Sequence, residues 1–234
     1  GFRLDGAAAY DFSGRSVSGA GDINGDGFDD VLIGASESDA NGFDSGSSYV
    51  VFGKASGFAA HIDLSTLDGT NGFSLDGIHP DDSVGISVSD AGDVNGDGLD
   101  DVIVSGDGSS YVMFGKASGF DAQIDVSSMD GQNGFRLVGG NINNVLGYSV
   151  SNAGDVNGDG FNDVMVDGLG ELAFVVFGRA SGFDATIDIS TLDGSNGFRL
   201  KGEHYSSLNA VSAAGDINGD GLGDVIVGSA FVFL

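Results

Sequence analysis

One nine-residue acidic motif is written four times along this chain, and no other feature of the sequence constrains the fold more strongly. The first copy reads Asp-Ile-Asn-Gly-Asp-Gly-Phe-Asp-Asp, and the copies begin at Asp22, Asp93, Asp155 and Asp216. A second marker, Gly-Phe-x-Leu, keeps almost the same step and begins at Gly1, Gly72, Gly134 and Gly197. Residues 1–234 are therefore predicted to form one domain built from four copies of a single unit.

The acidic motif has the donor pattern of a calcium loop. Positions 1, 3, 5 and 9 are Asp, Asn, Asp and Asp in every copy, whereas a metal-free turn needs no such repetition. Ca²⁺ takes about six to eight oxygen ligands, and the backbone carbonyl of position 7 would add one to these side chains. We expect one Ca²⁺ per repeat. The predicted ligands are Asp22, Asn24, Asp26, Phe28 and Asp30; Asp93, Asn95, Asp97, Leu99 and Asp101; Asp155, Asn157, Asp159, Phe161 and Asp163; and Asp216, Asn218, Asp220, Leu222 and Asp224.

The motif begins like an EF-hand loop but does not continue as one. An EF-hand needs a bidentate Glu at position 12, and here that position holds Ile33, Val104, Val166 and Val227. Position 8 changes from copy to copy and is not expected to be a ligand. Its residues are Asp29, Asp100, Asn162 and Gly223.

The flanks of each loop predict strands rather than helices. An alternating Ser-Val-Ser pattern precedes the loop in most copies, and a β-branched or apolar run follows it. A third, aromatic strand and the Gly-Phe-x-Leu strand complete the unit. A four-stranded antiparallel unit repeated about every 60 residues is typical of a β-propeller blade. We therefore expect an all-β propeller, with four blades if the N-terminal strand completes the last one. The alternative is part of a larger ring of seven or eight blades.

The order of these motifs resembles the FG-GAP repeats of the integrin alpha-subunit propeller and of bacterial integrin-like surface proteins. The resemblance covers essentially the whole chain, and in the first unit it rests on Ser-Val, the Asp-x-Asn-Gly-Asp-Gly-x-x-Asp loop and the Tyr-Val-Val-Phe-Gly strand. It implies blades, calcium, an extracellular or cell-surface location in a bacterium, and a role in adhesion or ligand recognition. Integrin propellers have seven blades, so the resemblance leaves the blade number open. A ring closed within one chain implies a monomer, and a ring shared by two chains implies a dimer.

Composition narrows the class of partner. The formal net charge of −27 argues against nucleic acid. No apolar run reaches the roughly 18 residues of a membrane helix, so no membrane insertion is expected. There are no cysteines, which removes disulfides and thiolate metal sites from consideration.

Ligand recognition is expected on the face opposite the metal loops. The loops between the second and third strands, and between successive units, differ most among the copies, as binding loops on a repeated scaffold do. The candidate ligand residues there are Tyr10, Phe43, His79, Asn144 and Tyr205. We expect a protein or carbohydrate ligand at a cell surface. The alternatives are a structural spacer or accessory domain in a larger exported adhesin or enzyme and, third, a glycan-active enzyme. No catalytic residues are recognisable, so no enzyme activity is expected.

Overall fold

A computed structural model describes residues 1–139, 146–168, 172–202, 210–228 and 231–233 of the chain. Strands account for its regular structure, apart from three one-turn 3₁₀ helices. The three 3₁₀ helices are η1 (Leu64–Thr66), η2 (Val126–Ser128) and η3 (Ile189–Thr191). Within the described residues, no helix is long and apolar enough to cross a membrane.

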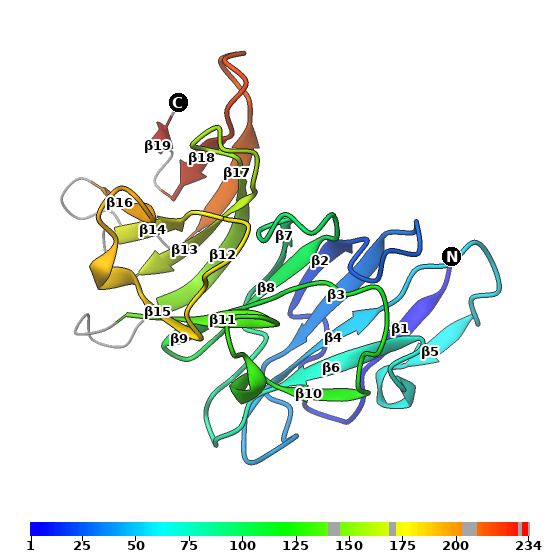
Figure 1. Cartoon of the computed structure of the whole chain (residues 1–234). Coiled ribbons are helices and arrows are strands. Elements are labelled where there is room, and N and C mark those ends of the chain that lie inside the picture. The colour runs from blue at the N-terminus through cyan, green and yellow to red at the C-terminus, as the bar shows by residue number, and fades with distance from the viewer. Residues whose placement is uncertain (140–145, 169–171, 203–209, 229–230, 234) are drawn as a thin grey trace.

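Four antiparallel sheets follow one another along the chain (Figure 1). The first contains β2 (Ser16–Gly21), β3 (Asp30–Ala35), β4 (Ser47–Val51) and β6 (Gly72–Asp76). The second contains β7 (Val88–Gly92), β8 (Asp101–Gly106), β9 (Ser109–Met113) and β11 (Gly134–Val138). The third contains β12 (Leu146–Gly154), β13 (Asp163–Gly168), β14 (Leu172–Val176) and β16 (Gly197–Lys201). The fourth contains β17 (Val211–Gly215), β18 (Asp224–Val227) and β19 (Phe231–Phe233). This arrangement is all-β and consistent with a β-propeller-like fold.

The strands predicted on either side of each acidic loop are confirmed in all four sheets. In β8 the run Val102, Ile103 and Val104 is buried on both faces of the sheet. The Ser-Val-Ser strands lie side by side, because a serine hydroxyl of one sheet accepts a backbone N–H from the next. Ser16 Oγ accepts from Val88 N at 3.0 Å, and the same contact recurs at the next two joints.

Aromatic side chains pack the first and second sheets against the units that follow them. Phe73 of β6 stacks on Phe120 with ring centroids 4.7 Å apart, and Phe135 of β11 stacks on Phe183 at the same separation. Phe120 and Phe183 end the repeated Gly-Lys/Arg-Ala-Ser-Gly-Phe segments. The core therefore lies between successive sheets, and each unit completes the core of its predecessor.

A short outer strand joins each unit to the one before it. These strands pair in parallel with the last strand of the preceding unit: β10 (Gln123–Asp125) with β6, and β15 (Thr186–Asp188) with β11. In the same way β1 (Arg3–Asp5) pairs in parallel with β5 (His61–Asp63). Thus β1 takes the place of a last strand in front of the first sheet.

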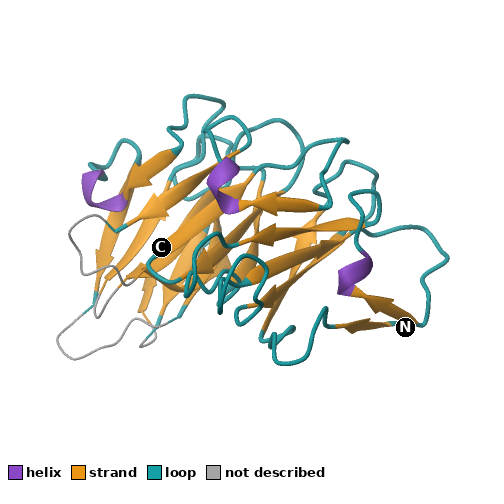
Figure 2. Ribbon diagram, turned by 90° about the horizontal axis from the view of Figure 1, so that it is seen from below, coloured by secondary structure: helices purple, strands orange, loops and turns teal. Residues whose placement is uncertain are grey.

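The expected pairing of the N-terminal strand with the last sheet is wrong in this structure. The described fourth sheet consists of β17, β18 and β19, and β1 lies far from it at the other end of the molecule (Figures 1 and 2). The parallel pairing with β5, in which Leu4 faces Ile62 as Leu75 faces Ile124, holds β1 beside the first sheet, which lies far from the last one. A closed ring, its number of blades and the single-domain assignment stay predictions.

Candidate metal loops and the opposite edge

The acidic motif forms the turn between the first two strands of each sheet, as predicted. In the first copy, Asp22 Oδ1 accepts the Asp26 N–H at 3.0 Å and its Oδ2 accepts the Gly27 N–H at 2.8 Å. Asn24 Oδ1 also accepts from Asp26 N, at 2.9 Å, and Asp26 Oδ1 accepts from Phe28 N at 3.0 Å. The side chains of positions 1, 3 and 5 therefore all turn back over the loop. The other three copies repeat these contacts.

Position 9 is a buried latch between the loop and the third strand. In the second copy Asp101 accepts the Val94 N–H at 2.8 Å on one carboxylate oxygen and the Gly115 N–H at 2.8 Å on the other. The first and third copies hold Asp30 and Asp163 in the same way. Asp224 accepts the equivalent N–H of Ile217 at 2.7 Å.

Burial raises the pKa of three latch carboxyls, those of Asp30, Asp101 and Asp163, although the backbone N–H groups oppose the change. The pKa rises to about 8 for Asp101, about 7 for Asp163 and about 6 for Asp30. The neighbouring Asp residues at positions 1 and 5 push in the same direction, because their negative charges disfavour a further one. A cation held by the loop would offset both effects.

The donor chemistry of the loops fits calcium. All donors are oxygens, and a carboxylate has about four lone-pair sites, so the two bonds accepted by Asp101 leave further sites for an ion. In the described part of the chain, no three His, Cys, Asp or Glu side chains lie close enough together to hold a metal ion by themselves. Ligation by positions 1, 3, 5 and 9, and by the position-7 carbonyl, stays a prediction.

Position 8, which the sequence analysis set aside, links neighbouring loops. Asp100 Oδ2 accepts the Asp22 N–H of the preceding loop at 2.8 Å, and Asn162 Oδ1 accepts the Asp93 N–H at 3.1 Å. Gly223 has no side chain to offer, and its own N–H donates to the Asp155 carbonyl at 2.7 Å. This link between loops could not be predicted from the motif alone, because the N–H group that position 8 accepts belongs to another repeat.

The side chains at position 7 also contact the preceding loop. A methyl of Leu99 lies against Gly25, and the ring of Phe161 lies against Gly96, so closely that a side chain at either glycine would meet it. Phe28 in the first loop is exposed instead. Positions 7 and 8 together therefore align the loops along one edge of the sheets.

The candidate ligand residues that the structure describes lie at the opposite edge. Tyr10 is 87% exposed and Phe43 is 68% exposed. The Phe43 loop is a neighbour of the His79 loop, because Asp81 N donates to the Phe43 carbonyl at 2.9 Å. The Tyr10 loop meets the start of the Phe43 loop, where Glu37 N donates to the Asp11 carbonyl at 3.4 Å. His79 is exposed, with Nδ1 3.5 Å from an Asp82 carboxylate oxygen.

The other two candidates, Asn144 and Tyr205, lie outside the described residues.

Strained backbone conformations also occur at this edge, opposite the metal loops. Among the residues that the structure describes, five non-glycine residues have positive φ angles, between 50° and 75°, and all of them lie in the same three loops. They are Tyr10, Phe12, Asp44, Asp81 and Ser83. Strained positions of this kind persist where the surrounding structure holds them, and they are common in binding loops.

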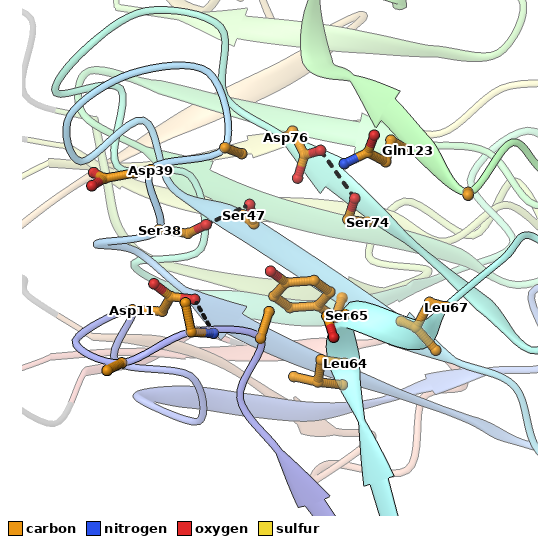
Figure 3. Close-up of a pocket in the computed structure, with 16 residues that line it drawn as sticks. Asp11, Ser38, Asp39, Ser47, Leu64, Ser65, Leu67, Ser74, Asp76 and Gln123 are labelled. Atoms are coloured by element: carbon orange, nitrogen blue, oxygen red, sulfur yellow. Dashed lines mark hydrogen bonds between the residues drawn. The ribbon is translucent and has the colours of Figure 1, made fainter.

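A hollow of about 600 Å³ opens beside the first sheet, next to these loops. Figure 3 shows Asp76 and Ser74 on one side of it and Asp11 on the other, with Ser38 and Ser47 between them. None of these residues was predicted as a site residue, because Ser74 is the variable position of a repeated marker and the others lie outside the repeated motifs. A signal was nevertheless present, since Ser74 stands where the other three Gly-Phe-x-Leu markers have Arg.

Two comparisons with known proteins agree with the repeat pattern. Residues 13–51 match the FG-GAP repeat family. Integrin alpha-6 from Gallus gallus is 25% identical to the chain over 162 residues, which is 68% of this chain and 14% of the integrin. The chain therefore spans a small part of the length of that relative. The resemblance predicted from the motifs is confirmed: residues 13–51 match an FG-GAP repeat, and the chain is similar to an integrin alpha chain.

Proposed function

We propose that this chain is a calcium-stabilised, extracellular ligand-recognition module without catalytic activity. The observation that carries the calcium part is the set of buried carboxyls at position 9. Asp101 is fully buried at the base of an oxygen-rich loop, and its pKa is raised because burial disfavours the charged form and Asp97 and Asp93 add negative charge nearby.

In this proposal calcium is structural. The side chains of positions 1, 3, 5 and 9 would hold the ion, which would supply positive charge where carboxylates crowd. The chain's own hydrogen bonds already shape the loop, and position 8 ties it to its neighbour. Loading the loops would therefore stiffen one whole edge of the sheets and leave the other edge free to differ between repeats.

Ligand recognition is assigned to the edge opposite the loops. Support comes from the exposed aromatic rings of Tyr10 and Phe43, and from the strained loops that present them. Similarity to an integrin alpha chain supports a protein ligand at a cell surface. A carbohydrate ligand would use the same exposed rings.

The recognition proposal is tested by binding to a glycan array and to cell-surface protein preparations, each with and without calcium. Tyr10→Ala and Phe43→Ala should reduce binding. Phe28→Ala is the matched control, because it removes an exposed aromatic ring from the loop edge. Equal binding by all three variants would contradict the placement of the ligand face, and no binding by the calcium-loaded protein would favour the structural spacer.

A further inference from the structure

The loop that follows each joint between neighbouring acidic loops holds position 1 of the loop before it. At the first joint, the Asp22 N–H donates to Asp100 Oδ2 at 2.8 Å, and the Asp22 carbonyl accepts the Asp100 N–H at 3.4 Å. At the second joint, the Asp93 N–H donates to Asn162 Oδ1 at 3.1 Å, and its carbonyl accepts the Asn162 N–H at 3.0 Å. Position 8 of one loop therefore fixes both backbone groups of a predicted metal ligand in the preceding loop.

Position 9 leads to a second contact with the preceding loop. Asp101 accepts the Gly115 N–H at 2.8 Å, and the next residue, Lys116, donates its N–H to the Ile23 carbonyl of the first loop at 3.0 Å. The third unit makes the same two contacts with the second loop. Positions 8 and 9 are adjacent in the chain, so the conformation of one loop is tied to the loop before it through both residues.

A glycine in front of each loop makes room for the position-8 side chain. Gly21 and Gly92 have φ angles of 61° and 64°, and a β-carbon on either would collide with the position-8 side chain of the next loop. Gly154 keeps this conformation at the third joint, with a φ angle of 73°, but it faces the backbone of Gly223. The third joint thus keeps the backbone contact and lacks the side-chain contact.

The second joint has an additional link between the inner strands. Asn152 Nδ2 on β12 donates to Asp90 Oδ2 on β7 at 3.0 Å, and Asn152 Oδ1 lies 3.5 Å from Asn162 Nδ2 as its acceptor. At the other two joints one member of the Asp90–Asn152 pair is replaced, by Gly19 at the first and by Ala213 at the third. The contacts therefore rank the second joint above the first, and the first above the third.

We propose that neighbouring loops bind calcium cooperatively, most strongly across the second joint and least across the third. The inference rests on the calcium proposal and adds how the sites depend on one another. Positions 8 and 9 become ordered when their own loop is loaded, and they fix position 1 of the preceding loop. The preceding loop then loses less conformational entropy on binding its own ion. Coupling between binding sites is reciprocal, so the two loops at a joint gain affinity by the same factor.

Charge acts in the opposite direction, because a loaded loop is less negative than an empty one and attracts the next cation less. Positions 4 to 6 are exposed in all four loops. Charges at such positions are screened over about 8 Å at physiological ionic strength. The hydrogen bonds at the joints are direct and are not weakened in this way. Coupling should therefore be positive, and added salt should not remove it.

The test is a calcium chloride titration of the full, isotope-labelled and metal-free chain, followed by NMR. The backbone N–H of the position-6 glycine reports on each loop separately, because it donates to the position-1 carboxylate. The four reporters are Gly27, Gly98, Gly160 and Gly221.

Removal of one ligand measures the coupling. Asp97→Ala disables the second loop, and the dissociation constants at the first and third loops should then rise about fivefold or more, with the larger change at the third. Asp220→Ala is the matched control, because it removes the same ligand from the fourth loop, across the joint that lacks the side-chain contact. It should raise the third-loop constant much less than Asp97→Ala does.

Two variants at position 8 separate coupling from a general loss of stability. Asn162→Ala removes the acceptor of the Asp93 N–H, whereas Asn162→Asp keeps one, as Asp100 does at the first joint. In the Asn162→Ala background, Asp97→Ala should affect the third loop much less and the first loop as before. In the Asn162→Asp background both effects should remain.

The outcomes distinguish this inference from the calcium proposal. Saturable shifts with the same dissociation constants in Asp97→Ala and wild-type protein would overturn the inference and leave the calcium proposal standing. Lower constants in Asp97→Ala would also overturn it, because they would show that charge outweighs the contacts at the joints. The absence of saturable shifts at all four reporters would overturn both proposals.

Discussion

The two edges of the sheets are built on different principles. At the loop edge, four copies of one motif make the same internal hydrogen bonds, and position 8 joins neighbouring copies at the first two joints. At the opposite edge the connections differ in length and sequence, carry all five of the strained non-glycine residues and border the hollow beside the first sheet. The repeated loops thus form the contacts that hold neighbouring sheets in place. The loops that differ between repeats carry the groups that are available to a ligand.

Calcium removal should give the largest difference between the two edges. A ligand that binds only the folded state stabilises it by about 2.7 kcal/mol per site at a concentration of 100 Kd. Several loaded loops should therefore raise the Tm substantially, and chelation should lower it. Differential scanning calorimetry on calcium-loaded and verified metal-free protein measures the effect, and coincident melting curves would contradict a structural role for the metal.

Loss of a position-9 carboxylate should come next. Asp101→Ala leaves the buried N–H groups of Val94 and Gly115 without acceptors. We expect a loss of about 2–5 kcal/mol in the free energy of unfolding, because each unsatisfied buried group costs about 1–3 kcal/mol. Asp107→Ala removes an exposed aspartate near the opposite edge and is the control. Denaturant unfolding of both variants checks the comparison, and equal stabilities would contradict the latch.

The pH dependence of the metal-free protein should follow from the same carboxyls. The folded-state pKa values of Asp101 and Asp163, about 8 and about 7, lie above the ordinary value of 3.8. The folded state therefore binds these protons more tightly than the unfolded state. The stabilisation is fully present below about pH 4 and is lost as the pH rises through 7 and 8.

Calcium should reverse this trend. An ion competes with protons for the carboxylates, so loaded protein should gain stability where metal-free protein loses it. Chemical unfolding at a series of pH values from 4 to 8, with chelator and with calcium, provides the measurement. A metal-free protein that grows more stable over this range would show that burial does not raise these pKa values.

Position 8 should give the smallest effect. Asp100→Ala removes one acceptor between the first two loops, which we expect to cost about 1–2 kcal/mol. Asp29→Ala is the matched control, because Asp29 is exposed in the first loop and accepts no hydrogen bond among the described residues. Equal unfolding free energies for the two variants would mean that the joints do not depend on this side chain.

The sequence predicted the local structure of each unit well, because that structure depends on local patterns. The apolar position 12 excluded an EF-hand, and the alternating and continuous apolar runs gave the strands on both sides of the loop. The same reasoning placed Tyr10, Phe43 and His79 at the edge opposite the loops. Each of these inferences needs residues from a single repeat.

Contacts between repeats were much harder to predict. The partner of β1 depends on a parallel pairing with β5, and the role of Asp100 depends on a backbone N–H of the preceding loop. The buried environment of Asp76 depends on three segments that meet only in the folded chain. Variation at position 8 was interpreted only as evidence that this residue is not a metal ligand, although Asp and Asn both supply the acceptor that links neighbouring loops.

The most direct test of the central claim is the number of calcium ions bound per chain. Native mass spectrometry of protein dialysed against calcium counts them. One ion per repeat predicts about four for the wild-type chain, and one fewer for Asp159→Ala, which removes a predicted ligand from the third loop. A chain that binds no calcium, or a variant that binds as many ions as the wild type, would contradict the account.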